Sequence, residues 1–160
     1  MQVLNKFKGL PHRQERLLLN DEIICINDSK ATNFESSLQS LKSYQNIFWI
    51  VGGLPKKGDK FFLNKLKKNI IKAYIIGKST IFFRKQLRKK VNLIVVNNLK
   101  NAFLKVIKDL KQIKNLNSLT KNKYTILFSP AAASFDQFAN FEDRGKKFKK
   151  LVYRARSSIY

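Results

Sequence analysis

Residues 47–53 read IFWIVGG, an unbroken run of large apolar side chains that stops at two glycines. Three further runs have the same form: AYII ends at Gly77, LIVV ends at residues 97–98, and YTILF ends at Ser129. Strands that are apolar throughout, rather than alternately apolar and polar, are typical of a parallel sheet that is covered on both faces. The four runs therefore predict the centre of such a sheet.

The segments around these runs complete the expected fold. Residues 16–19 (RLLL) and 23–26 (IICI) flank a turn at Asn20-Asp21, which predicts a short β-hairpin. Apolar residues spaced three and four apart predict helices near 34–42, 61–69, 81–89 and 99–111, and a last helix over 144–156. Strands that alternate with helices are joined by right-handed crossovers. We expect an α/β fold, a Rossmann-like, doubly wound, mostly parallel sheet with an N-terminal β-hairpin.

Composition limits the class of protein. The length of 160 residues suits one domain, and 44% hydrophobic residues are too many for a disordered chain. One cysteine excludes an internal disulfide, and with one histidine it leaves no basis for a zinc site or other metal site of common type. No stretch approaches the roughly 18 apolar residues of a membrane-spanning helix, and residues 1–6 do not lead into a secretory signal. We expect a soluble, cytoplasmic protein with no membrane partner.

The chain is strongly basic, with 33 Lys and Arg against 10 Asp and Glu and a net charge of +23. Such an excess favours a polyanionic partner. Most of the lysines, however, alternate with apolar residues at helical spacing, which is typical of the solvated face of a packed helix. No segment combines basic and aromatic residues in an RNA- or DNA-binding signature. Nucleic acid is therefore not the expected partner, and a basic nucleic-acid-binding surface stays as the alternative.

Two short motifs do not carry the function that they suggest. Residues 77–79 (GKS) match the end of a phosphate-binding P-loop, but that motif needs a glycine at position 72, which is Lys72. No segment has the G-x-G-x-x-G pattern of dinucleotide-binding folds. His12 lacks a second histidine or a paired carboxylate, and Cys25 lacks a base, so we expect both to be packing residues.

Polar residues gather where the expected strands end. Residues 28–33 (DSKATN), 52–59 (GGLPKKGD) and 129–136 (SPAAASFD) each follow an apolar run. Ligands of parallel sheets bind beyond the carboxyl ends of the strands, where an acid can take a ribose hydroxyl and Lys and Thr can bind a carboxylate. Residues 28–33 can equally be an elaborate helix N-cap. This edge predicts a site for a charged small molecule, with the cap as the alternative for its first segment.

The same blocks, taken in order, resemble a known family. They are residues 7–15 (FKGLPHRQE), 26–33 (INDSKATN), 52–59, and 129–145 (SPAAASFDQFANFEDRG). Together they resemble the C-terminal domain of the Mur ligases, and most closely the D-glutamate-adding branch of that family. The resemblance predicts a linker remnant at residues 1–6 and a C-terminal, amino-acid-binding domain at 7–156.

The resemblance also implies a reaction. In such ligases ATP phosphorylates the carboxylate of UDP-N-acetylmuramoyl-L-alanine, and the amine of D-glutamate attacks the acyl phosphate, which builds peptidoglycan. It implies ATP contacts from Arg13 near the phosphates and Asp28 near the ribose. It implies that D-glutamate is held by a further set of residues. This set comprises Lys30, Thr32, Lys56 (with Lys57 open as its alternative), Ser134, the backbone of Phe135, and Phe141.

The other parts of such a ligase have no counterpart in these 160 residues. In the family an N-terminal domain binds UDP, and a central domain holds the ATP-phosphate loop, the magnesium ligands and a carbamylated lysine. We therefore expect Mg²⁺ and most of ATP to bind on those domains, and we assign no catalytic residue here. The chain alone is expected to be inactive. Whether it is a cut domain, a split gene product or a truncated remnant is left open by the sequence.

Overall fold

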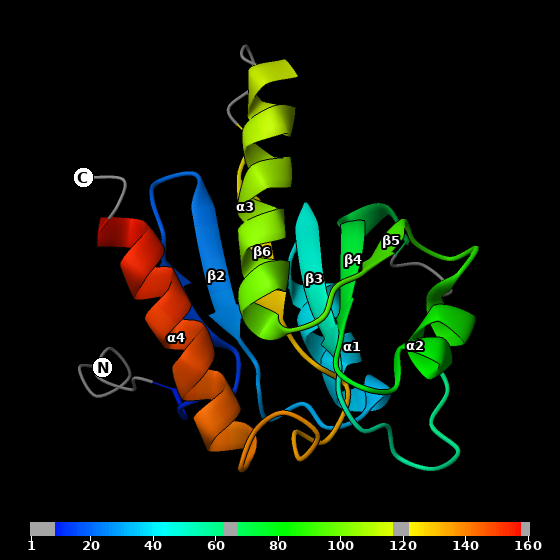
Figure 1. Ribbon diagram of the computed structural model, residues 1–160. Helices are drawn as coiled ribbons and strands as arrows, with labels where there is room; N and C mark the ends of the chain where they lie inside the picture. The colour runs from blue at the N-terminus through cyan, green and yellow to red at the C-terminus, as the bar shows by residue number, and fades with distance from the viewer. Residues whose placement is uncertain (1–8, 63–66, 117–121, 158–160) are drawn as a thin grey trace, which may run out of the picture.

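A computed structural model describes residues 9–62, 67–116 and 122–157, and there six strands form one sheet in the order β1-β2-β6-β3-β4-β5 (Figure 1). Strands β1 and β2 are an antiparallel hairpin, and the other neighbouring strands are parallel. The strands are β1 (Glu15–Leu18), β2 (Ile23–Asn27), β3 (Ile47–Gly52), β4 (Ile70–Ile76), β5 (Leu93–Val95) and β6 (Tyr124–Phe128). The expected Rossmann-like α/β fold with an N-terminal hairpin is confirmed.

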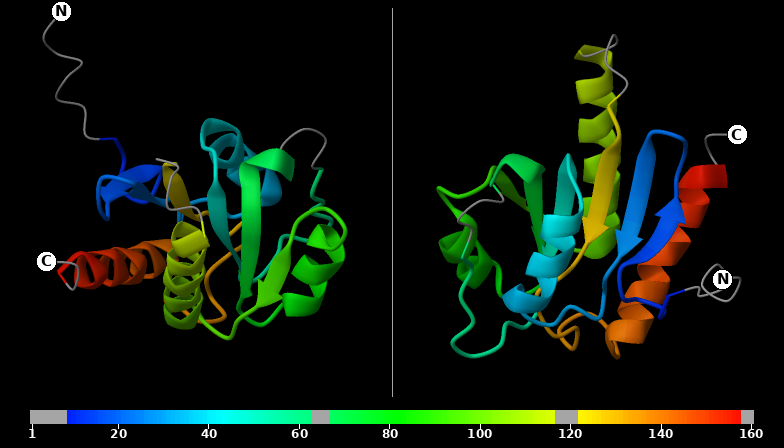
Figure 2. Two further views of the ribbon diagram at one scale, coloured as in Figure 1. Left: turned by 90° about the horizontal axis from the view of Figure 1, so that it is seen from above. Right: turned by 180° about the vertical axis from the view of Figure 1, so that it is seen from behind.

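Two pairs of helices cover the two faces of the sheet. The α-helices in the described residues are α1 (Phe34–Ser43), α2 (Thr80–Leu87), α3 (Leu99–Leu116) and α4 (Phe141–Ser157). Helices α3 and α4 lie in front of the sheet in Figure 1, and α1 lies in front when the molecule is seen from behind (Figure 2). Each pair packs into its own core, with Phe34 and Phe83 on one face and Phe103 and Phe148 on the other.

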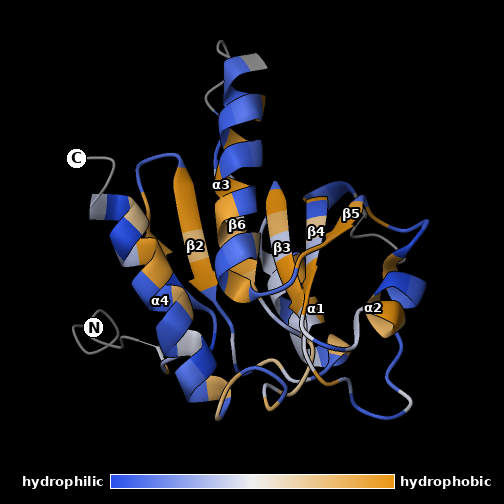
Figure 3. Cartoon of the chain, viewed as in Figure 1, coloured by the Kyte–Doolittle hydropathy of each residue, from blue (hydrophilic) through white to orange (hydrophobic). Residues whose placement is uncertain are grey.

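This layering explains the unbroken apolar runs. Neighbouring side chains of a strand point to opposite faces, so Phe48 joins the core under α3 and α4, and Trp49 joins the core under α1 and α2. Both are fully buried. In Figure 3 strands β2, β6 and β3 are accordingly mostly orange, whereas α3 and α4 carry much blue on the side that faces the viewer. The helices therefore have one apolar face each and the strands have two.

The helix expected at residues 61–69 is a wrong prediction where it can be checked. Phe61 and Phe62 are not helical, residues 63–66 lie outside the described residues, and Lys67–Asn69 form one 3₁₀ turn, η2. Phe61 has 1% of its surface exposed, and its ring centroid lies 5.0 Å from that of Phe34 and 5.4 Å from that of Trp49. Phe61 therefore fills the core beside α1 and does not belong to the apolar face of a helix.

Strand β4 begins at Ile70, three residues earlier than expected. The prediction was late because Lys72 interrupts the apolar run. Lys72 is accommodated there because its ammonium donates to Asp109 of α3 at 2.7 Å. Asp109 also accepts from Lys105 at 2.8 Å and from the Tyr74 hydroxyl at 2.8 Å. Burial acts to raise the pKa of Asp109, but the three donors outweigh it and lower the pKa to about 2. This ion cluster fixes α3 on the sheet.

None of the helices in the described ranges is both long enough and apolar enough to cross a membrane.

Candidate functional site

The carboxyl ends of the neighbouring parallel strands β2, β6, β3 and β4 meet at one edge of the sheet, toward the bottom of Figure 1. The loops that follow β2, β6 and β3 are joined there by backbone hydrogen bonds. Asp28 N–H donates to Phe128 O at 2.8 Å, and Gly52 N–H donates to Pro130 O at 2.9 Å. Leu54 and Ala133 exchange two bonds of 2.9 Å each. The predicted site segments therefore form one continuous platform.

Asp28 lies at the centre of this platform, with 5% of its surface exposed. One carboxylate oxygen accepts from the hydroxyls of Ser40 at 2.6 Å and Ser129 at 2.9 Å. The other oxygen accepts from Gln14 N–H at 3.2 Å. Burial raises the pKa of Asp28, and the two hydroxyls and the backbone donor act against it. The structure thus holds a carboxyl group in a place that disfavours its charge.

A cavity of about 250 Å³ opens beside Asp28. Its walls bring together three of the predicted residues, Arg13, Asp28 and Lys30, which come from two separate loops. Ser36 and Gln39 of α1 also line it, and the full lining is Arg13, Gln14, Asp28, Lys30, Ala31, Ser36 and Gln39. The two residues expected to contact ATP therefore share a cavity with the first of the residues expected to bind D-glutamate.

His12 anchors the segment that carries Arg13. Its ring Nδ1 lies 3.0 Å from the Asn27 amide nitrogen, and its backbone carbonyl accepts from Lys30 N–H at 3.0 Å. Burial lowers the pKa of His12, although Glu15 acts in the opposite direction. A neutral ring is suited to accept the Asn27 hydrogen bond through Nδ1. This agrees with the packing role expected for His12.

Gly145 of α4 lies against the His12 ring, and Gly145→Ala is expected to displace it. An added Cβ would lie 2.2 Å from His12 Nδ1 and 2.7 Å from Cγ. Alanine by itself stabilises a helix relative to glycine by about 1 kcal/mol. We nevertheless expect Gly145→Ala to lower the free energy of unfolding by about 1–3 kcal/mol, because the clash with the His12 ring outweighs that gain. Thermal unfolding measures it, with Gly9→Ala as the control, since nothing lies within 4 Å there. A variant more stable than the parent would show that His12 is free to move.

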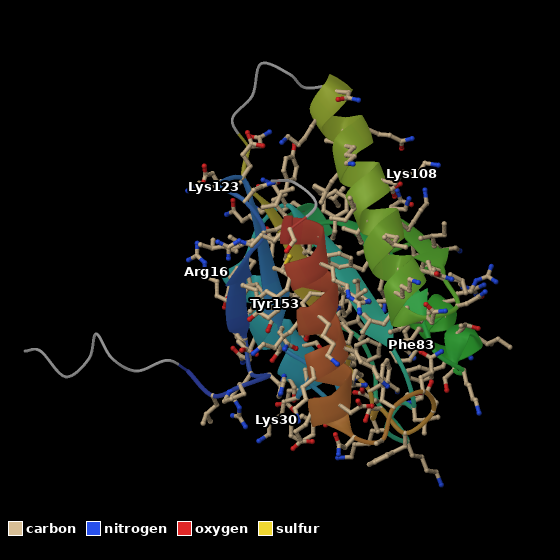
Figure 4. The ribbon with its side chains drawn as sticks, turned by 60° about the vertical axis from the view of Figure 1, so that its left-hand side comes forward. Arg16, Lys30, Phe83, Lys108, Lys123 and Tyr153 are labelled. Atoms are coloured by element: carbon tan, nitrogen blue, oxygen red, sulfur yellow. The ribbon has the colours of Figure 1, made fainter. Side chains whose placement is uncertain are left out.

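Lys30 also faces the start of α4. Its ammonium lies 5.4 Å from the centroid of the Phe141 ring, within the range of a cation–π contact. Figure 4 shows Lys30 at the lower end of the molecule, beside the first turn of that helix. Two residues predicted to bind D-glutamate are thus in contact although they are far apart in the sequence.

The remaining predicted residues lie along the same edge, outside the walls of the cavity. Thr32 and Lys56 are exposed, Ser134 is buried, and Phe135 has 70% of its surface exposed. Lys57 is exposed as well, so the choice between Lys56 and Lys57 stays open.

The two interpretations of residues 28–33 can now be separated. The N-cap of α1 is Asn33, whose side chain accepts from Ser36 N–H at 2.8 Å. The Phe34 N–H, also in the first turn of α1, donates to the carboxylate of Asp59 at 2.9 Å. The cap therefore needs neither Asp28 nor Lys30, and these two side chains line the cavity instead.

Sequence reasoning missed the roles of three residues. Asp59 caps α1, Asp136 accepts from Lys78 N–H at 2.9 Å, and Arg144 donates to the loops after β2 and β6. Asp136 thereby ties the glycine-lysine-serine segment at 77–79 to the loop after β6. For the two aspartates the usable signal was rarity, because the chain has only 10 acidic residues. Arg144 carries no such signal, since it is one of 33 Lys and Arg residues.

Across the described part of the chain, no three His, Cys, Asp or Glu side chains form a group that could hold a metal ion.

Comparison with known proteins gives a consistent set of relatives, although no family model matches the chain. Each relative cited here is named UDP-N-acetylmuramoylalanine–D-glutamate ligase. The protein from the Wolbachia of Brugia malayi is 43% identical over 156 residues, which is 98% of this chain and 30% of that protein. The protein from Rickettsia felis is 38% identical over 96% of this chain and 33% of its own length. The protein from Rhizobium meliloti is 37% identical over 91% of this chain and 30% of its own length.

The chain thus spans about 30% of the length of the curated relatives that it matches, while the matches cover nearly all of the chain. By these matches the chain is homologous to the C-terminal portion of the UDP-N-acetylmuramoylalanine–D-glutamate ligases of the Mur ligase family.

Proposed function

We propose that this chain is the amino-acid-binding part of an ATP-dependent ligase that joins D-glutamate to UDP-N-acetylmuramoyl-L-alanine through an acyl phosphate. The observation that carries the proposal is the position of Lys30. It lines one cavity with Arg13 and Asp28, and it also lies over the ring of Phe141. A residue that is shared between a nucleotide side and an amino-acid side suits a reaction in which ATP phosphorylates a carboxylate and the amine of D-glutamate then attacks the same carboxyl carbon.

The pair Arg13 and Asp28 has the chemistry for ATP. A guanidinium is a strong partner for phosphate oxygens, and a carboxylate accepts from ribose hydroxyls. Asp28 has capacity for such a bond, because within the described ranges its Oδ1 accepts one hydrogen bond, from Gln14 N–H at 3.2 Å, and a carboxylate oxygen has two lone pairs. Ser36 and Gln39 supply neutral polar groups to the same cavity.

The neighbouring loops have the chemistry for an amino acid with two carboxylates. Lys30 and Thr32 offer an ammonium and a hydroxyl on one loop, and Ser134 and the Phe135 backbone offer donors on the next. Lys56 or Lys57 brings a further cation to the same edge. Holding the D-glutamate amine beside an acyl phosphate is catalysis by positioning, which needs no general base from this chain.

Magnesium and the phosphoryl-transfer machinery are assigned to the rest of the ligase. A magnesium ion bound there would neutralise phosphate charge during acyl phosphate formation. This chain's own residues bind and orient ATP and D-glutamate. We therefore expect the chain by itself to release no phosphate, even when all three substrates are present.

The alternative of a nucleic-acid-binding remnant is not proposed. Exposed Lys and Arg side chains occur on α2, which packs on one face of the sheet, and on α3 and α4, which pack on the other. Several lysines are also paired with acids, such as Lys147 with Asp143 at 3.0 Å. Such a distribution is typical of solvated helix faces.

The test uses a chimera in which this chain replaces the matching C-terminal portion of the Rickettsia felis relative. We expect phosphate release that depends on D-glutamate and on UDP-N-acetylmuramoyl-L-alanine. Lys30→Ala is expected to lower kcat/KM for D-glutamate about 10- to 100-fold, as expected when a hydrogen bond to a charged group is lost. Lys42→Ala, an exposed lysine in the last turn of α1, is the matched control.

Two results would refute the proposal. One is a folded chimera that does not ligate D-glutamate under conditions in which its parent does. The other is a Lys30→Ala variant whose kcat/KM equals that of the Lys42→Ala control.

A further inference from the structure

Arg144 is the least exposed charged side chain in the part of the chain that the structure describes, with 1% of its surface exposed. It lies in the first turn of α4 and makes three hydrogen bonds. Nε donates to the Ser29 hydroxyl at 3.0 Å, and Nη2 donates to the Ser29 carbonyl at 2.7 Å and to the Ala132 carbonyl at 2.9 Å. One side chain thus joins the loop after β2 to the loop after β6.

These two loops carry the residues proposed to hold D-glutamate. Ser29 directly precedes Lys30, and Ala132 lies two residues before Ser134. The Ser29 hydroxyl in turn donates to the carbonyl of Phe141 at 2.8 Å. These contacts link three of the four segments proposed to contact D-glutamate, namely the two loops and the start of α4. The fourth segment, which carries Lys56 and Lys57, is not among them.

The burial of the Arg144 guanidinium is by itself energetically unfavourable. Removing a charge from water costs free energy unless it is paired, and the described residues place no carboxylate in hydrogen-bond contact with Arg144. Burial lowers the pKa of Arg144 to about 10, with Asp136 acting in the opposite direction, so the group stays charged near neutral pH. Its Nη1 has no hydrogen-bond partner in the described part. An apolar side chain would pack there without these costs, but it could not bind two loop carbonyls.

We infer that Arg144 is a positioning residue, which sets the spacing between the Lys30 loop and the Ser134 loop to match the two carboxylates of D-glutamate. The inference rests on the proposed function. Arg144 acts through Ser29 and Ala132 and not by contact with the substrate. The walls of the ATP cavity do not include Arg144, and Asp28 is held there by its own bonds from Gln14, Ser40 and Ser129. We therefore expect the effect of Arg144 on the amino-acid side of the site rather than on ATP.

The test compares Arg144→Lys and Arg144→Met in the same chimera. A lysine can donate to one of the carbonyls but lacks the planar fork that reaches both loops. We expect KM for D-glutamate to rise about 10-fold or more with Lys and further with Met. KM for ATP and for UDP-N-acetylmuramoyl-L-alanine is expected to stay within about twofold. Arg156→Met, at an exposed position in the last turn of α4, is the control.

Two kinetic results would overturn the inference. One is an unchanged KM for D-glutamate in both variants. The other is a parallel rise of the KM values for D-glutamate and ATP, because general damage to the fold would affect both.

A second measurement separates this inference from the proposed function. Amide hydrogen exchange of the chimera is expected to quicken in both loops, 28–33 and 129–136, when Arg144 is replaced by lysine. An unmutated chimera that fails to ligate D-glutamate would overturn the proposed function. Exchange that stays unchanged in either loop would overturn the role of Arg144 in joining them.

Discussion

Replacing Gly52 with alanine is expected to lower the free energy of unfolding by about 3–5 kcal/mol. Gly52 ends β3 with a φ of +131°, which L side chains rarely adopt. An added Cβ would lie 2.0 Å from the Ile76 carbonyl oxygen and 2.9 Å from the Ile76 carbonyl carbon. Both atoms are backbone of the adjacent strand β4, which cannot turn aside as a side chain could. For a chain of this size the loss corresponds to a drop of about 10 °C in Tm.

Two further glycines give matched controls for this variant. Gly58 has a φ of +77° with nothing within 4 Å of an added Cβ, so Gly58→Ala measures backbone strain alone, about 1–2 kcal/mol. Gly9→Ala has neither feature and is expected to leave Tm unchanged. If Gly52→Ala and Gly58→Ala lose the same stability, close approach to β4 is not the reason for the glycine.

Asp28→Asn is expected to raise KM for ATP about 10- to 100-fold, while the protein stays as stable as before or becomes more stable near neutral pH. Burial raises the pKa of Asp28, so the folded protein holds its carboxylate at a disadvantage. Asparagine has nearly the same shape and no charge. Its oxygen can accept from Gln14 N–H, and its amide group can donate to the hydroxyls of Ser40 and Ser129. What it loses is a charged acceptor for the ribose.

The pH dependence of stability checks the sign of this effect. Because the pKa of Asp28 is raised on folding, its contribution is fully present below the pKa of the unfolded chain, about 3.9. That contribution declines as pH rises through the higher pKa of the folded state. The parent protein is therefore expected to lose stability relative to Asp28→Asn over this range, as measured by thermal unfolding from about pH 3 to pH 7. Asp21→Asn, at an exposed hairpin turn, is the control.

Either of two results with Asp28→Asn would contradict the prediction, one on the KM for ATP and one on stability. A variant that keeps the parent's KM for ATP would remove Asp28 from the nucleotide site. A variant that is less stable than the parent by about 2 kcal/mol or more near neutral pH would mean that the carboxylate is kept for the fold and not for the ligand.

The fold could be predicted where local pattern and burial agree. Residues 124–128 form β6 with the expected bounds, because a strand that is covered on both faces has a nearly continuous apolar sequence. The same logic missed the start of β4, because Lys72 interrupts the apolar run and its partner Asp109 lies far along the chain. The helix expected at 61–69 failed for a related reason, since Phe61 fills a gap beside Phe34 and Trp49 that spacing alone does not reveal.

The candidate site could likewise be predicted only in part. Topology alone places residues 28–33 and 129–136 at one edge, because parallel neighbours end together. Which side chains then meet across the edge depends on contacts between distant residues, and Ser29 and Arg144 are 115 positions apart. No local motif announces such a pair. The position of Arg144 in the sequence block was visible from the start, but its role required the folded loops.

The place of β6 in the sheet has a consequence for how the protein is made. Strand β6 pairs with β2 on one side and β3 on the other, so it joins the β1–β2 hairpin to the β3–β4–β5 unit. During synthesis the facing edges of β2 and β3 stay unpaired until residues 124–128 have been made. Unpaired apolar strands of this kind are prone to aggregate. The contacts from Ser129 to Asp28, from Pro130 to Gly52 and from Asp136 to Lys78 all come from the loop that follows. A nascent chain therefore acquires the edge that holds the candidate site in the same late step that completes its sheet.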